Sequence, residues 1–384
     1  MSKLPKRFVL LRLLGLAVFA LLATIAPRLA VAESSDIPMA VVGPMTGDWA
    51  VYGEEMRRGA QLAADDINGE GGIGGRKITL TFLDDEGRPD AAISVARKLA
   101  KGGVRFVIGH YNSGASIPAS IIYAKNNTLM VSPASTNPAL TDAKLWNTIR
   151  TAGRDDVQGT FAGEYMAGHF SARNLAIVSD GTPYGDGLAA KARKALLAKR
   201  RPEKLFSRIE PGQANFSRLV AKIEAAKIGA VFFAGLADDF GRLIRETSEA
   251  GLKVQFISGD GAMVKDLSAI AGPAVEGTLI MFSFEDRDNP AAQEVVRRFR
   301  SQGFEPEAYT LKTYAAVQVI ANGIKMAGVQ APRAVAASIR SGQPIPTVVG
   351  DLTFDAKGDR RERDVRMYVW RKQADRRFML DAAD

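Results

Sequence analysis

Short apolar runs alternate with longer amphipathic segments from residue 37 onward. An apolar run of four to eight residues is typical of a buried strand, and apolar positions spaced three and four apart are typical of a helix with one buried face. In the first part of the chain the pattern predicts strands at 39–42, 78–83, 106–108 and 129–131, and helices at 56–67, 93–99 and 118–125.

The alternation restarts near residue 157. It predicts helices at 157–170, 188–197, 216–226 and 240–250, and strands at 175–178, 230–234, 254–257 and 278–282. A mostly helical tail follows, with helices at 290–300, 310–326 and 333–339 and short strands at 348–354 and 365–370. Strands that alternate with helices form parallel sheets covered on both faces, so we predict an α/β protein with Rossmann-like lobes.

The N-terminus has the layout of a secretory signal peptide. Four basic residues within the first twelve precede an apolar run at 13–26, and Ala30-Val31-Ala32 provides a small-residue cleavage site. The apolar run is shorter than the roughly 20 residues that a membrane-spanning helix needs. We therefore predict export to the periplasm with cleavage after Ala32, leaving a mature chain long enough for about two domains.

Composition removes several classes of function. The chain has no cysteine and only two histidines, His110 and His169, so a His/Cys metal site is unsupported. The net charge of +9 includes five basic residues before residue 33, and the other charges are interleaved rather than gathered on one element, so nucleic acid is not an expected partner. We expect no cofactor and no metal.

The one nucleotide-like motif is in the wrong context. Residues 69–74 match G-x-G-x-x-G, but they follow a predicted helix and precede a strand, the reverse of the order that holds a pyrophosphate. We interpret them as a tight turn. No nucleophile elbow, P-loop or H-E-x-x-H motif is present, so we do not expect an enzyme.

Four loops at predicted strand ends are rich in glycine and small polar residues, at 43–53, 109–116, 132–137 and 259–261. Parallel sheets bind ligands beyond the carboxyl ends of their strands, where helix N-termini also favour anions. A ligand site is therefore expected where these loops meet.

The same loops carry a family resemblance. Residues 40–47 (AVVGPMTG), 107–110 (VIGH), 132–136 (SPAST), 184–188 (YGDGL), 260–261 (DG) and 313–316 (TYAA) resemble the leucine/isoleucine/valine-binding proteins, the type I periplasmic binding proteins of amino-acid ABC transporters. The resemblance implies two lobes joined by a three-segment hinge. It places lobe 1 at 33–153 plus 283–363 and lobe 2 at 154–282 plus 364–384, after a signal peptide at 1–32.

The resemblance also implies an α-amino-acid headgroup site. Ser113 and Thr136 would donate hydroxyl hydrogen bonds to the ligand carboxylate, and Ala134 and Ser135 would offer backbone groups. Each of these segments precedes a helix, whose N-terminus favours an anion. Ordinary helix capping would account for either hydroxyl residue alone.

The second lobe would supply Asp260 for the ligand ammonium, since a carboxylate and an ammonium form charge-assisted hydrogen bonds. An aspartate between two glycines is also a common turn residue. By resemblance, Tyr184 packs on the ligand from the second lobe, and Tyr52 and Tyr309 form aromatic walls from the first.

Two positions depart from the family pattern: Leu236 replaces a frequent aromatic residue, and Trp49 adds bulk at the first-lobe loop. Some members hold this lobe with a disulfide whose positions here are Gly87 and Asn112. The pocket for the ligand side chain is therefore expected to differ.

The resulting prediction is a monomeric periplasmic component that binds a hydrophobic or branched-chain amino acid and delivers it to an inner-membrane ABC permease. Three alternatives stay open. The same fold could bind an aromatic acid, an amide or another small carboxylate, or serve as a sensor ectodomain, and a secreted hydrolase could use a serine near His110.

Overall fold

The computed structural model describes residues 36–283, 285–307, 309–362, 365–374 and 378–383. The predicted signal peptide and its cleavage site lie outside these residues. Within them, none of the helices combines the length and the apolar character needed to cross a membrane.

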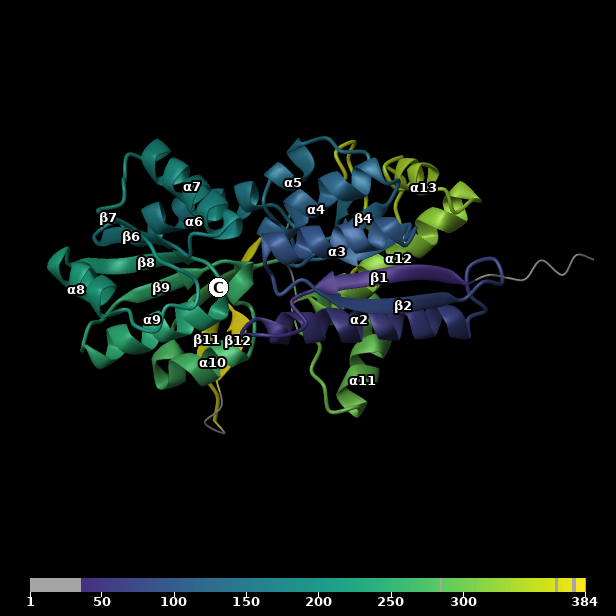
Figure 1. Cartoon of the computed structure of the whole chain (residues 1–384). Coiled ribbons are helices and arrows are strands. Elements are labelled where there is room, and N and C mark those ends of the chain that lie inside the picture. The colour runs from purple at the N-terminus through teal and green to yellow at the C-terminus, as the bar shows by residue number, and fades with distance from the viewer. Residues whose placement is uncertain (1–35, 284, 308, 363–364, 375–377, 384) are drawn as a thin grey trace, which may run out of the picture. The chain divides into compact units, whose positions relative to one another are not determined.

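The first lobe is built on a parallel sheet that the alternating pattern predicted (Figure 1). Its strands run in the order β2-β1-β3-β4-β5. They are β1 (Ile37–Gly43), β2 (Ile78–Asp84), β3 (Phe106–Gly109), β4 (Leu129–Ser132) and β5 (Thr148–Arg150).

Helices cover both faces of this sheet. Helices α2 (Ala50–Gly69) and α12 (Thr310–Ala327) pack together on one face, and α3 (Pro89–Lys101) and α4 (Ser113–Lys125) pack on the other. Successive side chains of a strand point to opposite faces, so Met39 and Val41 join the core under α2 while Ala40 and Val42 join the core under α3 and α4. The short helix α5 (Ala139–Asp142) and α13 (Pro332–Ile339) complete this lobe.

The second lobe has a seven-stranded sheet in the order β12-β11-β10-β9-β8-β6-β7. The five strands from β6 to β10 are parallel, whereas β11 and β12 are antiparallel additions at one edge. The bounds are β6 (Asn174–Ser179), β7 (Leu205–Arg208), β8 (Ile228–Ala234), β9 (Gln255–Ser258), β10 (Leu279–Phe282), β11 (Arg366–Lys372) and β12 (Phe378–Ala382).

Helices α6 (Asp155–His169) and α7 (Pro183–Ala198) pack together on this second sheet. A further set contains α8 (Ser217–Ala225), α9 (Ala237–Glu249) and α10 (Asp266–Ala271). The remaining elements are α11 (Gln293–Ser301) and four short 3₁₀ helices: η1 (Asp260–Ala262), η2 (Gly272–Val275), η3 (Asp286–Asp288) and η4 (Pro290–Ala292).

The chain passes between the two sheets three times: after β5, after β10 and before β11. This is the connectivity expected of a three-segment hinge. The exact lobe boundaries stay a prediction.

One predicted strand is wrong. Residues 348–354 form no strand, because Leu352 and Phe354 make only isolated bridges, to Ile345 and Arg360. Val348, Leu352 and Phe354 are nevertheless buried, and the Val348 amide donates to Gln318 Oε1 at 2.7 Å. The apolar pattern there reflects a loop that packs on the core. Its backbone hydrogen bonds are made to a side chain and within turns.

The glycine-rich segment is a turn, as its context predicted. Gly71, Gly72 and Gly74 all have positive φ between α2 and β2. A Cβ on Gly72 would lie 2.2 Å from the carbonyl oxygen of Arg76, so only glycine fits there.

Candidate ligand-binding site

Strand-end loops of both lobes enclose a cavity of about 220 Å³, which we call the inner pocket. Its lining includes seven of the residues that the sequence singled out: Trp49, Ser113, Ala134, Tyr184, Leu236, Asp260 and Tyr309. Tyr52, Ser135 and Thr136 are buried beside the pocket but are not among its lining residues.

The first-lobe wall contains the N-terminus of α4. Ser113 is the first residue of this helix, and its Oγ accepts a hydrogen bond from the amide of Asn137 at 3.2 Å. The helix is 13 residues long, so its free N-terminal amides and its dipole favour an anion near Ser113.

The neighbouring loop after β4 is held from inside the lobe. Arg150 is fully buried, and its Nη1 donates to the carbonyl oxygens of Ser135 at 2.9 Å and Asn137 at 3.0 Å. The Ser135 hydroxyl donates to the carbonyl oxygen of Tyr111 at 2.8 Å, so this side chain points into the lobe. Ala134 is therefore the member of the loop that reaches the inner pocket.

Asp260 supplies a buried carboxylate from the second lobe. It is 4% exposed and begins η1 directly after β9. The hydroxyl of Tyr184 donates to its Oδ1, and the hydroxyl of Tyr309 donates to its Oδ2, each at 2.9 Å. Burial raises the pKa of Asp260, and the two tyrosine hydroxyls and Gln158 oppose that rise because they stabilise the charged form.

A second buried carboxylate, Asp155, lies at the start of α6. It is 0% exposed, and neither carboxylate oxygen has a hydrogen-bond partner within normal limits. Burial, followed by the charge of Asp260, raises its pKa well above the usual value, while nearby Thr136 lowers it. The Thr136 hydroxyl is also buried without a hydrogen-bond partner. The two buried carboxylates, Asp260 and Asp155, mark this side of the site as one that favours a cation.

Tyr52 joins the two lobes. Its hydroxyl donates to the carbonyl oxygen of Gly261 at 2.7 Å and accepts from the amide of Ala237 at 3.4 Å. Together with the bond from Tyr309 to Asp260, these contacts hold the strand ends of the two lobes against each other. The structure is therefore a closed arrangement of the site.

Trp49 occupies space beside Gly87. A Cβ on Gly87 would lie 2.3 Å from the Trp49 ring and 2.9 Å from Asn112 Oδ1. Gly87 and Asn112 are thus neighbours, as the disulfide of some family members implies for these positions. With glycine at 87, the indole has room to form part of the pocket wall.

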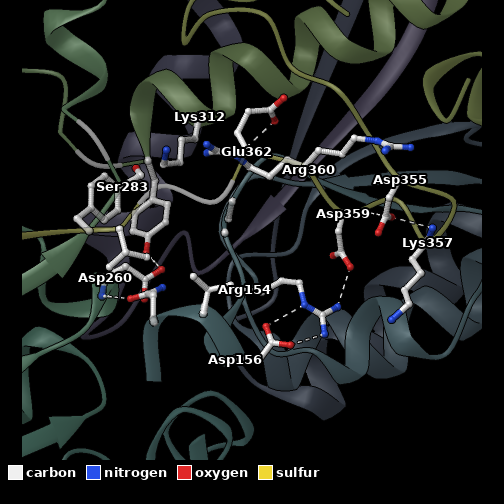
Figure 2. Close-up of a pocket in the computed structure, with 18 residues that line it drawn as sticks. Arg154, Asp156, Asp260, Ser283, Lys312, Asp355, Lys357, Asp359, Arg360 and Glu362 are labelled. Carbon is white, nitrogen blue, oxygen red and sulfur yellow. Dashed lines mark hydrogen bonds and ion pairs between the residues drawn. The ribbon is translucent and has the colours of Figure 1, made fainter. Parts of the chain in front are cut away.

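A larger cavity of about 450 Å³ adjoins the inner pocket, with Asp260 and Tyr309 lining both. Figure 2 shows Arg154 within it, reaching Asp156 and Asp359. Lys312 pairs with Asp286 at 2.7 Å. These charges neutralise one another across the segments that connect the lobes, so they stabilise the hinge.

His110 lies behind the pocket rather than in its lining. Its Nδ1 lies 2.6 Å from Asp85 Oδ2, and its Nε2 lies 3.0 Å from the Tyr123 hydroxyl. Its carbonyl oxygen accepts from Ser132 at 2.8 Å. Among the described residues, no group of three or more histidine and acidic side chains could hold a metal ion.

Comparison with known proteins shows the family of the chain. Residues 36–375 match the family model described as periplasmic binding protein. The chain belongs to the periplasmic binding protein family. A relative from Brucella melitensis, named Leu/Ile/Val-binding protein homolog 1, is 47% identical over 344 residues, which is 90% of this chain and 93% of that protein.

Solved structures of periplasmic binding proteins have the same fold. A leucine-binding protein from Thermotoga maritima has a TM-score of 0.83 at 24% identity, over 91% of this chain and 98% of that one. An ABC transporter substrate-binding protein from Desulfitobacterium hafniense, in complex with Leu, has a TM-score of 0.72 at 27% identity, over 90% and 99%.

Sequence reasoning missed two buried residues at this periplasmic binding protein's site. Asp155 was not considered: it is buried close enough to Asp260 to feel its charge, though it lines neither cavity, and an acidic residue at a helix start close to a lobe crossing is a usable signal. Tyr111 lies in the loop at 109–116, which was singled out as a whole, and it lines the inner pocket. Nothing in the sequence distinguishes it from a core tyrosine.

Proposed function

We propose that this protein is the solute-binding component of an amino-acid ABC transport system, binding a hydrophobic or branched-chain amino acid between its lobes. The observation that carries the proposal is the buried Asp260 carboxylate facing the N-terminus of α4 across one small pocket. Such a site presents an anion and an anion-binding helix end to the two charged groups of one α-amino acid. The name of the Brucella relative supports the same class of ligand.

In this proposal the ligand carboxylate lies at the start of α4. Ser113 donates its hydroxyl, and Thr136, which is buried beside the pocket, is the second donor. The backbone of Ala134 borders the same region, and Ser135 acts through its backbone, because its hydroxyl is used inside the lobe.

The ligand ammonium lies at Asp260, with the buried charge of Asp155 nearby. Asp260 is already oriented by Tyr184 and Tyr309, so binding requires no rearrangement of that carboxylate. An ammonium would also offset the electrostatic cost of keeping Asp155 ionised in a buried position. The ligand side chain then lies against Trp49 and Leu236.

The proposal includes a lobe arrangement in which 33–153 plus 283–363 form the first lobe and 154–282 plus 364–384 the second. Membership of β1 to β5 in one sheet and of β6 to β12 in another supports these limits. The lobes open and close about the three crossings, with the ligand favouring the closed state.

The transport role implies export, cleavage after Ala32 and delivery of the ligand to an inner-membrane permease by a monomer. The layout of residues 1–32 supports export. A hydrolytic role for Ser113 is disfavoured, because both ring nitrogens of His110 contact Asp85 and Tyr123 instead. We therefore propose a protein that binds its solute without converting it.

The test is isothermal titration of leucine and of 4-methylpentanoate, which is leucine without its amine. We expect leucine to bind and the amine-free acid to bind far more weakly. Asp260→Ala should weaken leucine binding about 30-fold or more, since truncating one partner of a buried charge pair costs about 2–5 kcal/mol.

Asp65→Ala is the matched control, because Asp65 is an exposed carboxylate on α2. Unchanged leucine affinity in Asp260→Ala would remove Asp260 from the site. Preference of the wild-type protein for the amine-free acid would replace the ligand class and leave the fold unaffected.

A further inference from the structure

The hydroxyl of Tyr111 is a buried polar group in the inner pocket that has no hydrogen-bond partner. Tyr111 is 4% exposed, and its ring stacks on Tyr52 at 4.6 Å and meets the edge of Tyr309 at 5.0 Å. These contacts fix the ring, so the hydroxyl cannot turn away to reach solvent. A buried hydroxyl that lacks a partner costs free energy, and a ligand group can supply that partner.

A second polar atom without a partner lines the same pocket. Asn112 Oδ1 is buried without a hydrogen bond, at the part of the wall next to Gly87 and Trp49. Rotating the Asn112 amide by half a turn would put its nitrogen where its oxygen lies. In either orientation a polar atom faces the wall next to Gly87 and Trp49. Pro89, Pro183, Pro211 and Leu236 make much of the surrounding wall apolar, and Arg88 and Thr182 also line the pocket.

The headgroup does not account for these two atoms. Asp260 receives its hydrogen bonds from Tyr184 and Tyr309, not from Tyr111. The carboxylate position at the start of α4 has Ser113 and Thr136 as its side-chain donors. Tyr111 packs against both Tyr309 and Tyr52, and Tyr52 contacts Gly261 and Ala237 next to Leu236. Its hydroxyl bonds neither Asp260 nor another described protein group, so we assign it to the ligand side chain.

We propose that Tyr111 is a specificity-determining residue that favours a branched ligand side chain carrying a hydroxyl, so that threonine binds more tightly than its isostere valine. This inference rests on the proposed amino-acid-binding function. A hydrocarbon side chain leaves the Tyr111 hydroxyl unpaired, whereas a ligand hydroxyl pairs with it. Sites that hydrogen-bond a ligand hydroxyl discriminate strongly against the analogue without it.

The experiment is calorimetric titration of threonine and valine into the wild-type protein and into Tyr111→Phe. Threonine and valine have nearly the same shape, and phenylalanine keeps the Tyr111 ring, so only hydroxyl groups change. We expect threonine to bind the wild type at least about tenfold more tightly than valine. In Tyr111→Phe that preference should disappear, with valine affinity unchanged or improved. Tyr165→Phe is the control, because Tyr165 lies on α6 away from the pocket.

Two results would overturn the inference: wild-type protein that binds valine as tightly as threonine, or a Tyr111→Phe variant that loses the same factor for both ligands. The second result would mean that the Tyr111 hydroxyl binds the ligand headgroup or stabilises the fold instead. Failure of the proposed function is distinguishable, because then leucine, valine and threonine would all fail to bind the wild-type protein. Circular dichroism checks that Tyr111→Phe is folded.

Discussion

Asp155 combines complete burial with a carboxylate that has no hydrogen bond, a combination that costs stability unless a cation is near. Burial and then the charge of Asp260 raise its pKa, so its folded pKa lies above its unfolded value of about 4. Between these two values the folded state binds more protons than the unfolded state. The free energy of unfolding therefore falls as pH rises through that interval.

This gives a prediction for Asp155→Asn without ligand. The variant cannot ionise, so near pH 7 it should unfold at a higher temperature than the wild type, by about 1.4 kcal/mol for each unit by which the pKa is raised. The difference should vanish below about pH 4, where Asp155 is neutral in both states. Thermal unfolding across a pH series measures it. A variant that is less stable by the same amount at every pH would show that Asp155 has a structural role instead.

At the level of single residues, the sequence identified site residues that lie in the loops after strand ends. Asp260 and Ser113 lie within four residues of the ends of β9 and β3, and both line the inner pocket. Tyr111 and Asp155 were missed because burial and a missing partner are properties of the folded chain. Ser135 was predicted to act through its backbone; its hydroxyl is used within the lobe, an orientation that the sequence does not record.

At the level of elements, periodicity located the long helices and the buried apolar strands. Strands β5 (TIR), β7 (LFSR) and β12 (FMLDA) were not predicted, although β3, β4, β9 and β10 are as short, because polar and charged residues interrupt their apolar runs. The segment at 348–354 was wrongly assigned, because a buried loop and a strand both place apolar residues inside.

Helix packing explains one glycine that the sequence leaves unremarkable. A Cβ on Gly59 of α2 would lie 2.2 Å from the carbonyl oxygen of Thr310, the first residue of α12. Glycine therefore allows α2 to approach the start of the helix that follows Tyr309. The amide of Tyr309 also donates to Glu55 Oε2 of α2, at 3.1 Å.

We predict that Gly59→Ala destabilises the protein by about 1–3 kcal/mol, because overpacking at a backbone contact forces the helices apart. Leucine affinity should fall as well, since Tyr309 would shift from Asp260. Gly69→Ala is the control: it lies at the end of the same helix, with no atom within 4 Å of the added Cβ. Thermal unfolding and calorimetry measure the two effects. Equal stability of the two variants would contradict the packing argument.

At the level of the whole molecule, the contacts between lobes decide how easily the site opens. Tyr52 bonds Gly261 and Ala237 across the lobes, while acidic groups oppose one another at the rim. Burial is the largest cause of the raised pKa of Asp238, and the charge of Asp48 on the first lobe adds to it. Closure is thus a balance between a few hydrogen bonds and like-charge repulsion, and a bound ligand that bridges the lobes shifts that balance.

Tyr52→Phe tests this balance. In the closed state the variant leaves the Gly261 carbonyl and the Ala237 amide without their partner, whereas in an open state water can bond to both. The closed state is therefore destabilised by about 1 kcal/mol relative to the open state, and the leucine concentration at which half of the protein is closed should rise about five- to tenfold.

The radius of gyration of the fully liganded protein should stay the same, because Tyr52 is not among the residues that line the inner pocket. Small-angle scattering during a leucine titration measures both quantities, with Tyr165→Phe as the control. An unchanged midpoint would mean that closure depends on the ligand and the Tyr309–Asp260 contact alone, and a lower plateau in compaction would mean that Tyr52 shapes the closed state itself.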